Sequence, residues 1–243
     1  MKILGIVAGS VVCLMLSAGS LTAQEPDNGG SAQSSEPQQM RGIFNDSMQF
    51  EVQEEKAMII YFIDRFEKNT KFNERKGITN VYQMAPSRIM MSTTLGTREG
   101  EETNVLKLKY FRADEGGPYG KGGWCGYYSS LKDTNNPANP YFNASDYSYL
   151  TMWVKGETGA ENFILGLADK HWDKAGDSVK SQQVIFYLPD GAVTKEWQKA
   201  RIPLSDFLLD ISRLSSLAIC FESTCFPEGR GEGIVYIDDI AFE

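Results

Sequence analysis

The sequence contains one histidine, His171, and four cysteines among 243 residues. A single imidazole excludes metal centres built on several histidines, and the cysteines include no C-x-x-C pair of the kind that holds zinc. A Ser-His-Asp triad would have to use His171, yet no G-x-S-x-G turn occurs, and neither does a GxGxxG or GxxxxGK[ST] loop. The sequence therefore gives no support for a triad hydrolase or a nucleotide-binding protein.

Positive charge is also scarce, with 24 Lys and Arg against 32 Asp and Glu, for a net charge of −8. We therefore expect no nucleic-acid partner and no anionic membrane surface as a partner, because binding to both relies on Lys and Arg. Two carboxylates at a set separation are enough for glycoside hydrolysis, but no motif marks such a pair. We expect no catalytic residues and a protein that is not an enzyme.

Long apolar runs are absent, and the first 23 residues hold the nearest approach to one. Lys2 precedes an apolar stretch that ends near Leu16, and small residues follow up to Ala23. This pattern is typical of a cleaved signal peptide and is too short to span a membrane. Val12 stands where a lipid-attachment motif at Cys13 would need a small residue. We expect a secreted or periplasmic monomer that is not inserted in a membrane.

Residues 24–56 are expected to be a low-complexity linker and lead-in segment, since 24–42 lack aromatics and are rich in Gln, Ser, Gly and Pro. The folded domain is then 57–243. Within it, short apolar runs alternate with Gly, Pro, Asn and Asp clusters, which indicates strands. The expected strands lie near 58–64, 87–95, 104–112, 124–131, 149–155, 162–168, 182–188, 197–202, 216–222 and 233–242. With one short helix expected near 204–214, the sequence predicts an all-β, antiparallel two-sheet jelly-roll β-sandwich.

Alternation within the strands assigns their faces. The residues expected to face the core are Leu150, Met152, Val154, Phe163, Leu165, Leu167, Leu217, Ile219 and Phe221. The opposite face of these strands carries Trp153, Ala218 and Glu222, and is neither wholly apolar nor simply charged. This mixed face is predicted to form a concave outer surface.

Aromatic residues are the strongest positive signal, with 13 Phe, 11 Tyr and 4 Trp. Several stand in polar or glycine-rich surroundings, where a flat ring beside hydrogen-bonding groups suits a sugar. The alternative is that each ring packs at the core edge and that His171 caps a loop. The candidate ligand-binding residues are Tyr119, Trp124, Tyr128, Trp153, His171, Trp172 and Asp173.

The cysteines leave two alternatives. Cys220 and Cys225 are close enough in sequence to form a disulfide across the turn between them, which an exported protein permits. Alternatively, Cys220 and Cys125 are small side chains that pack within strands.

Three motifs follow one another along the chain: IDRFE at 63–67, WQKARIPLSDF at 197–207 and YIDDI at 236–240. Their order resembles the galactose-binding-like β-sandwich group, and within it carbohydrate-binding modules of the family 11 kind, over residues 58–243. This resemblance implies non-catalytic binding of a β-glucan-like polysaccharide or oligosaccharide on a concave face, a structural calcium, and action alone or with a separate glycoside hydrolase. The chain is also similar to the domain of complex I intermediate-associated protein 30. That similarity implies the alternative of a protein-interaction or assembly factor.

The last strand contains two adjacent acids, Asp238 and Asp239. Alternation puts Asp238 on the same face as Tyr236 and Ile240, which we interpret as the core side. A buried carboxylate must be paired, hydrogen-bonded or metal-bound. The terminal strands lie close together in galactose-binding-like folds, so we expect a structural Ca²⁺. Its candidate ligands are Asp64, Glu67, Asp238 and Asp239. The alternative is that Arg65 or a lysine neutralises Asp239.

Overall fold

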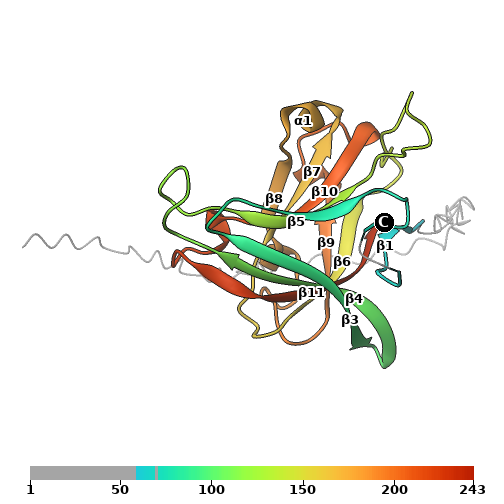
Figure 1. The fold of residues 1–243 in the computed structure, drawn as a ribbon. Helices are drawn as coiled ribbons and strands as arrows, with labels where there is room; N and C mark the ends of the chain where they lie inside the picture. Colours follow the sequence, from blue (N-terminus) through green and yellow to red (C-terminus); the bar gives the residue numbers. More distant parts are fainter. Residues whose placement is uncertain (1–58, 69–70) are drawn as a thin grey trace, which may run out of the picture. The chain divides into compact units, whose positions relative to one another are not determined.

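Two antiparallel sheets make up the fold in a computed structural model, which describes residues 59–68 and 71–243 (Figure 1). The larger sheet has the order β3-β4-β11-β6-β9, with β1 paired to β11. Its strands are β1 Tyr61–Asp64, β3 Arg88–Arg98, β4 Glu101–Arg112, β6 Tyr149–Gly156, β9 Gln198–Pro203 and β11 Gly231–Phe242. The smaller sheet has the order β2-β5-β10-β7-β8. Its strands are β2 Thr79–Gln83, β5 Cys125–Ser130, β7 Ile164–Asp169, β8 Val179–Gln183 and β10 Leu214–Phe221. The predicted two-sheet antiparallel sandwich is confirmed.

The core lies between the sheets, and the predicted alternation holds there. Leu150 and Met152 of β6 are fully buried, and so are Leu217 and Ile219 of β10. All four belong to one cluster that joins the two sheets. Burying each such side chain stabilises the fold by roughly 1.5–3 kcal/mol.

Several elements differ from the sequence prediction. β2 was not expected, because TNVYQ is mostly polar. The run expected as a strand at 182–188 divides into the end of β8 and a 3-10 turn, η1 Val184–Tyr187. The helix expected at 204–214 is instead two 3-10 turns, η2 Leu204–Asp206 and η3 Ile211–Arg213. Another 3-10 turn, η4 Ser223–Cys225, follows β10.

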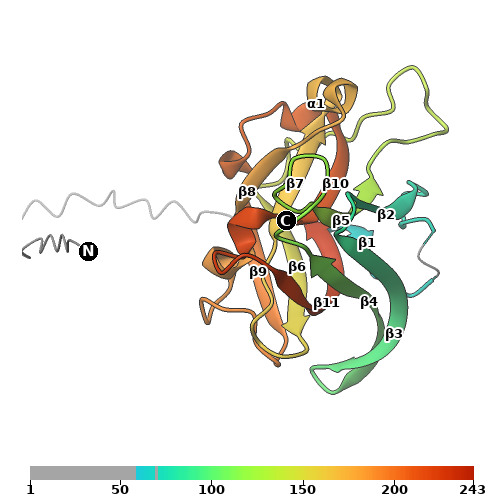
Figure 2. The same cartoon turned by 60° about the vertical axis from the view of Figure 1, so that its left-hand side comes forward.

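A short helix, α1 Lys170–Ala175, lies where polar sequence surroundings indicated no helix, at the end of β7 and beside the start of β10 (Figure 2). Asp169 caps its start, since one carboxylate oxygen accepts hydrogen bonds from the backbone N–H of His171 and Trp172. Gly176 ends it in a left-handed conformation with φ 70°. These two caps fix a helix that apolar periodicity does not reveal.

Asp238 is fully buried as predicted, but it does not face the core. Ile237 is in the core cluster, so the next side chain along β11 points to the outer face of the larger sheet. The register with β6 shifts between Asp238 and Ala241, and Asp239 has φ 46°. Ile240 then returns to the core. This β-bulge reverses the alternation, which is why the interpretation that put Asp238 on the core side is wrong.

The three cysteines among the described residues, Cys125, Cys220 and Cys225, are buried free thiols. The structure therefore favours the packing alternative over a disulfide between Cys220 and Cys225.

The predicted signal peptide at 1–23 and the linker at 24–56 lie outside the described residues, as do the first two residues of the predicted domain. In the part of the chain that the structure does describe, no helix has the length and apolar character needed to cross a membrane.

Candidate functional site

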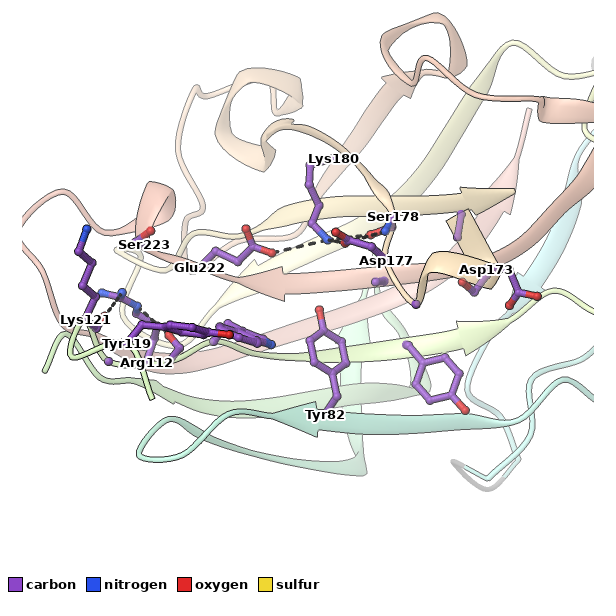
Figure 3. Close-up of a pocket in the computed structure, with 18 residues that line it drawn as sticks. Tyr82, Arg112, Tyr119, Lys121, Asp173, Asp177, Ser178, Lys180, Glu222 and Ser223 are labelled. Atoms are coloured by element: carbon purple, nitrogen blue, oxygen red, sulfur yellow. Dashed lines mark hydrogen bonds and ion pairs between the residues drawn. The ribbon is translucent and has the colours of Figure 1, made fainter. Parts of the chain in front are cut away.

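A groove of about 850 Å³ runs over the outer face of the smaller sheet (Figure 3). Ala218 of β10 lies in it, while its neighbours Leu217 and Ile219 face the core. The lining residues are Tyr82, Arg112, Tyr119, Lys121, Gly122, Gly123, Trp124, Tyr128, Ala168, Asp173, Gly176, Asp177, Ser178, Lys180, Ser216, Ala218, Glu222 and Ser223. The mixed outer face predicted from Ala218 and Glu222 is thus part of a real depression.

One side of the groove is aromatic. Tyr82 comes from β2, Tyr128 from β5, Trp124 from just before β5, and Tyr119 from the glycine-rich loop that precedes it. Tyr119 is 73% exposed and Trp124 is 37% exposed. The strand pairing of β2 with β5 brings Tyr82 beside the others. The groove therefore has several rings along one side.

Charged groups lie on the opposite side of the groove, across from Tyr82 (Figure 3). The ammonium of Lys180 lies 2.7 Å from the Ser178 hydroxyl, 3.5 Å from Asp177 and 3.6 Å from Glu222. Asp173 accepts two hydrogen bonds of 3.0 Å from Lys132. These groups can donate to and accept from the hydroxyl groups of a ligand that stacks on the rings.

The groove rings differ from those on the outer face of the larger sheet. There, each of four rings has a cation near its face: Arg88 at 4.9 Å from Phe111, Arg98 at 5.1 Å from Trp153, Lys107 at 5.6 Å from Tyr236 and Arg201 at 4.2 Å from Tyr149. Within residues 59–68 and 71–243, no cation or second ring contacts Tyr119, Trp124 or Tyr128 in this way. Among the described residues, these groove rings therefore differ from those four in having no cation over a face.

The structure brings together four of the seven predicted ligand-binding residues: Tyr119, Trp124, Tyr128 and Asp173 line the groove. Trp153 lies on the other sheet, where it pairs with Asp238 in register. His171 and Trp172 lie on α1 and are not among the groove residues. The choice of Trp153 and Trp172 followed their polar sequence surroundings, which do not determine the sheet or the helix face on which a ring ends.

The sequence reasoning missed Tyr82, Lys180 and Arg112. Tyr82 belongs to the unpredicted strand β2, and Lys180 to a strand predicted three residues too late. Arg112 is the last residue of β4 in the larger sheet, yet it reaches the groove. The sequence shows that Arg112 shares a strand face with Tyr110, two residues earlier. It does not show that this side chain lies near the smaller sheet.

Cys220, fully buried beside the groove residue Tyr82, is a protonated thiol rather than an activated nucleophile. Burial raises the pKa of Cys220 to about 11, although Lys180 and a hydrogen bond from the Tyr82 hydroxyl oppose this shift. The Tyr82 oxygen lies 2.9 Å from the Cys220 sulfur. A thiol held in this way is not the thiolate that nucleophilic catalysis requires.

The four predicted calcium ligands do not form one donor set. Arg98 lies 3.1 Å from a carboxylate oxygen of Asp238 and 2.6 Å from one of Asp239, so a guanidinium stands where the sequence predicted a metal cation. Glu67 instead accepts hydrogen bonds from Thr103 and Asn104.

Asp64, the fourth predicted ligand, accepts a hydrogen bond from the backbone N–H of Phe66, and burial raises its pKa to about 6. Across the described residues, no group of three or more His, Cys, Asp and Glu is arranged to hold a metal ion. The geometry therefore does not fit the calcium hypothesis, which stays a prediction for a chelator to test. Arg65, which was to neutralise Asp239, pairs with Glu74.

Known structures share this architecture. The family 11 carbohydrate-binding module of a cellulosomal cellulase of Clostridium thermocellum is 15% identical, with a TM-score of 0.53 over 76% of this chain and 95% of that one. A family 11 module from Clostridium thermocellum, in complex with a β-1,3-1,4-mixed-linked tetrasaccharide, is 16% identical, with a TM-score of 0.53 over 75% and 94%. A family 30 module is 19% identical, with a TM-score of 0.50 over 76% and 88%. At these identities the likeness shows the fold alone.

The fold is that of carbohydrate-binding modules of the β-sandwich type. The profile of carbohydrate binding domain 30 matches residues 88–243, and the chain belongs to this family. This confirms the resemblance to galactose-binding-like carbohydrate-binding modules. The comparison with curated proteins gave no match.

Proposed function

We propose that the protein is an exported, non-catalytic binder of a β-glucan-like polysaccharide, held in the groove of the smaller sheet. One observation carries the proposal: Tyr119, Trp124 and Tyr128 line the groove, which also holds a row of charged and hydroxyl groups. A pyranose presents an apolar face to a ring and hydroxyl groups to polar neighbours, so both sides of the groove would be used. The mixed-linked tetrasaccharide held by the family 11 module supports this ligand class.

Calorimetric titration of the full chain with mixed-linked β-glucan tests the proposal. We expect saturable binding and no release of reducing sugar during prolonged incubation. If the chain binds neither this glucan nor insoluble glucans, and crosslinking captures a partner protein, the alternative of a protein-interaction or assembly factor is favoured. Release of reducing sugar that depends on one carboxylate would instead show a glycoside hydrolase.

Export and assembly are part of the same proposal. We propose cleavage after Ala23 by the secretory pathway, giving a monomer that acts alone or beside a separate glycoside hydrolase. N-terminal sequencing of the protein recovered from the periplasm or the medium tests the cleavage. A chain retained in the cytoplasm with Met1 intact would contradict it.

A further inference from the structure

Arg112 is a buried cation at one end of the groove, with 5% of its surface exposed. Its side chain donates to three backbone carbonyls: Nε to Gly123 at 3.1 Å, Nη1 to Gly229 at 2.8 Å and Nη2 to Lys121 at 3.1 Å. A guanidinium has five N–H donors, so one N–H on each terminal nitrogen remains after these three bonds. The carbonyls satisfy hydrogen bonds, but they do not neutralise the charge.

The same end of the groove holds a second cation without a counter-ion. Lys121 is exposed and lines the groove, and Figure 3 shows it beside Arg112 and Tyr119. Within residues 59–68 and 71–243, neither Arg112 nor Lys121 forms an ion pair with a carboxylate. Asp114, two residues beyond Arg112 in the chain, pairs with neither.

The acids in the groove form their ion pairs with other cations. Asp177 and Glu222 lie within 3.6 Å of Lys180, and Asp173 lies 3.0 Å from Lys132. Asp173 is at the opposite end of the groove from Arg112 (Figure 3). Among the described residues, the groove cations that lack an ion-pair partner, Arg112 and Lys121, therefore lie at one end, although the chain as a whole carries −8.

From this arrangement we infer that the Arg112 end of the groove binds an acidic sugar, a glycan unit that carries a carboxylate. The inference rests on the proposed glycan-binding function and specifies the charge of the ligand. A carboxylate matches the planar donors of a guanidinium and would place a counter-ion beside a buried cation. Tyr119, which lies beside Arg112 in Figure 3, and Trp124, next to the Gly123 carbonyl that Arg112 contacts, would stack on the ring that carries it.

Three forms of one probe separate charge from shape. The probe is a mixed-linked β-gluco-tetrasaccharide, used neutral, with a terminal glucose oxidised at C6 to the uronate, and as the methyl ester of that uronate. By calorimetry at low salt, we expect the uronate to bind about tenfold tighter than the other two forms, as one charge-assisted contact allows. The advantage should shrink at high salt, because Lys121 is exposed to screening.

Two variants locate the effect. Lys121→Gln should remove most of the advantage of the uronate over the neutral and ester forms. The matched control is Lys195→Gln, an exposed lysine outside the groove, which should preserve the advantage. Arg112→Lys keeps the charge but loses the planar donors, so it should also reduce the advantage. Its melting temperature shows whether the carbonyl contacts still hold the loop.

The outcomes distinguish this inference from the proposed function. Equal affinity for uronate, ester and neutral forms would overturn the acidic-sugar inference and leave glycan binding intact. The same holds if the uronate advantage survives in Lys121→Gln and Arg112→Lys, since the carboxylate would then bind elsewhere. If no form binds, the proposed function itself fails.

Discussion

The guanidinium of Arg98 lies 5.1 Å from the centre of the Trp153 ring. The same guanidinium forms ion pairs with Asp238 and Asp239 at the bulge of β11. Arg98, the last residue of β3, therefore links β3 to β11 on the outer face of the larger sheet. A cation over an aromatic face stabilises it and blocks a sugar from stacking there. Trp153 therefore serves as a matched comparison for the groove rings.

Replacing Trp124 by alanine should reduce the affinity for mixed-linked β-glucan about tenfold, because a stacking surface in the groove is lost. Trp153→Ala removes a ring of the same size from the other sheet and should leave the affinity unchanged. Calorimetry at one temperature, with melting temperatures of both variants, checks the pair. A loss confined to Trp153→Ala would move the binding site to the larger sheet.

Two glycines of the groove loop should differ sharply when changed to alanine. Gly122 has φ 72°, and a Cβ there would lie 1.7 Å from the carbonyl oxygen of Ala113, so Gly122→Ala should destabilise the fold by about 3 kcal/mol or more. Gly120 has φ 68° but open space around it, so Gly120→Ala should cost about 1 kcal/mol. Urea unfolding measures both changes. Equal costs would contradict the close packing of the loop against Ala113.

Glu161 should stabilise the loop between β6 and β7. Its buried carboxylate accepts five hydrogen bonds from residues 157–160. Glu161→Gln replaces one acceptor oxygen with a donor that opposes the N–H groups of Gly159 and Ala160, so we expect a loss of about 2 kcal/mol or more in urea unfolding. Glu196→Gln, an exposed control, should change little. Similar stabilities for the two variants would refute the role of Glu161.

The same carboxylate should give an acid-dependent stability. Burial alone would raise the pKa of Glu161, but hydrogen bonds from the Thr158 backbone and side chain and from other loop amides lower it below its ordinary value. A depressed pKa in the folded state means that stabilisation is present above the unfolded value of about 4.3 and is lost as the pH falls through the folded one. The wild type should therefore lose more stability than Glu161→Gln on acidification from pH 5. Parallel curves would show that Glu161 does not titrate in this way.

Asp238 should act in the opposite direction. Burial, and then the neighbouring Asp239, raise the pKa of Asp238 to about 7, while Arg98 opposes the shift. Because the folded state holds this proton more tightly, the contribution of Asp238 to stability falls as the pH rises from about 4 to about 7. Asp238→Asn should remove this fall, and the exposed control Asp190→Asn should retain it. Unfolding free energies of the two variants, measured from about pH 4 to pH 7, test this contrast. If Asp238 is ionised throughout that range, both variants show the same pH dependence.

Calcium is tested by chelation. If Glu67 and Asp238, with Asp64 or Asp239, bind the ion, EDTA lowers the melting temperature and added Ca²⁺ restores it, because a ligand bound only by the native state stabilises it. An unchanged melting temperature removes the calcium prediction and leaves Arg98 as the counter-ion of both aspartates.

Sequence patterns predicted much of the sandwich because strand alternation is a local property. Leu150, Met152, Leu217 and Ile219 were assigned to the core and are fully buried there. Caps and bulges were harder to predict. The helix at Lys170–Ala175 depends on two caps, and the bulge at Asp239 depends on the pairing of β11 with β6, which no local pattern contains.

The sequence by itself determined the all-β class, the buried faces and the abundance of aromatic and acidic residues. It also indicated Tyr119, Trp124, Tyr128 and Asp173 as candidates, and these line the groove. Tertiary structure alone decided which rings have a cation over one face: Arg98 lies over Trp153, while no cation of the described residues lies over Trp124. It likewise decided the charge of the groove end, since Arg112 reaches there from the other sheet. Contacts between residues far apart in the chain follow from strand pairing and packing, which alternation does not specify.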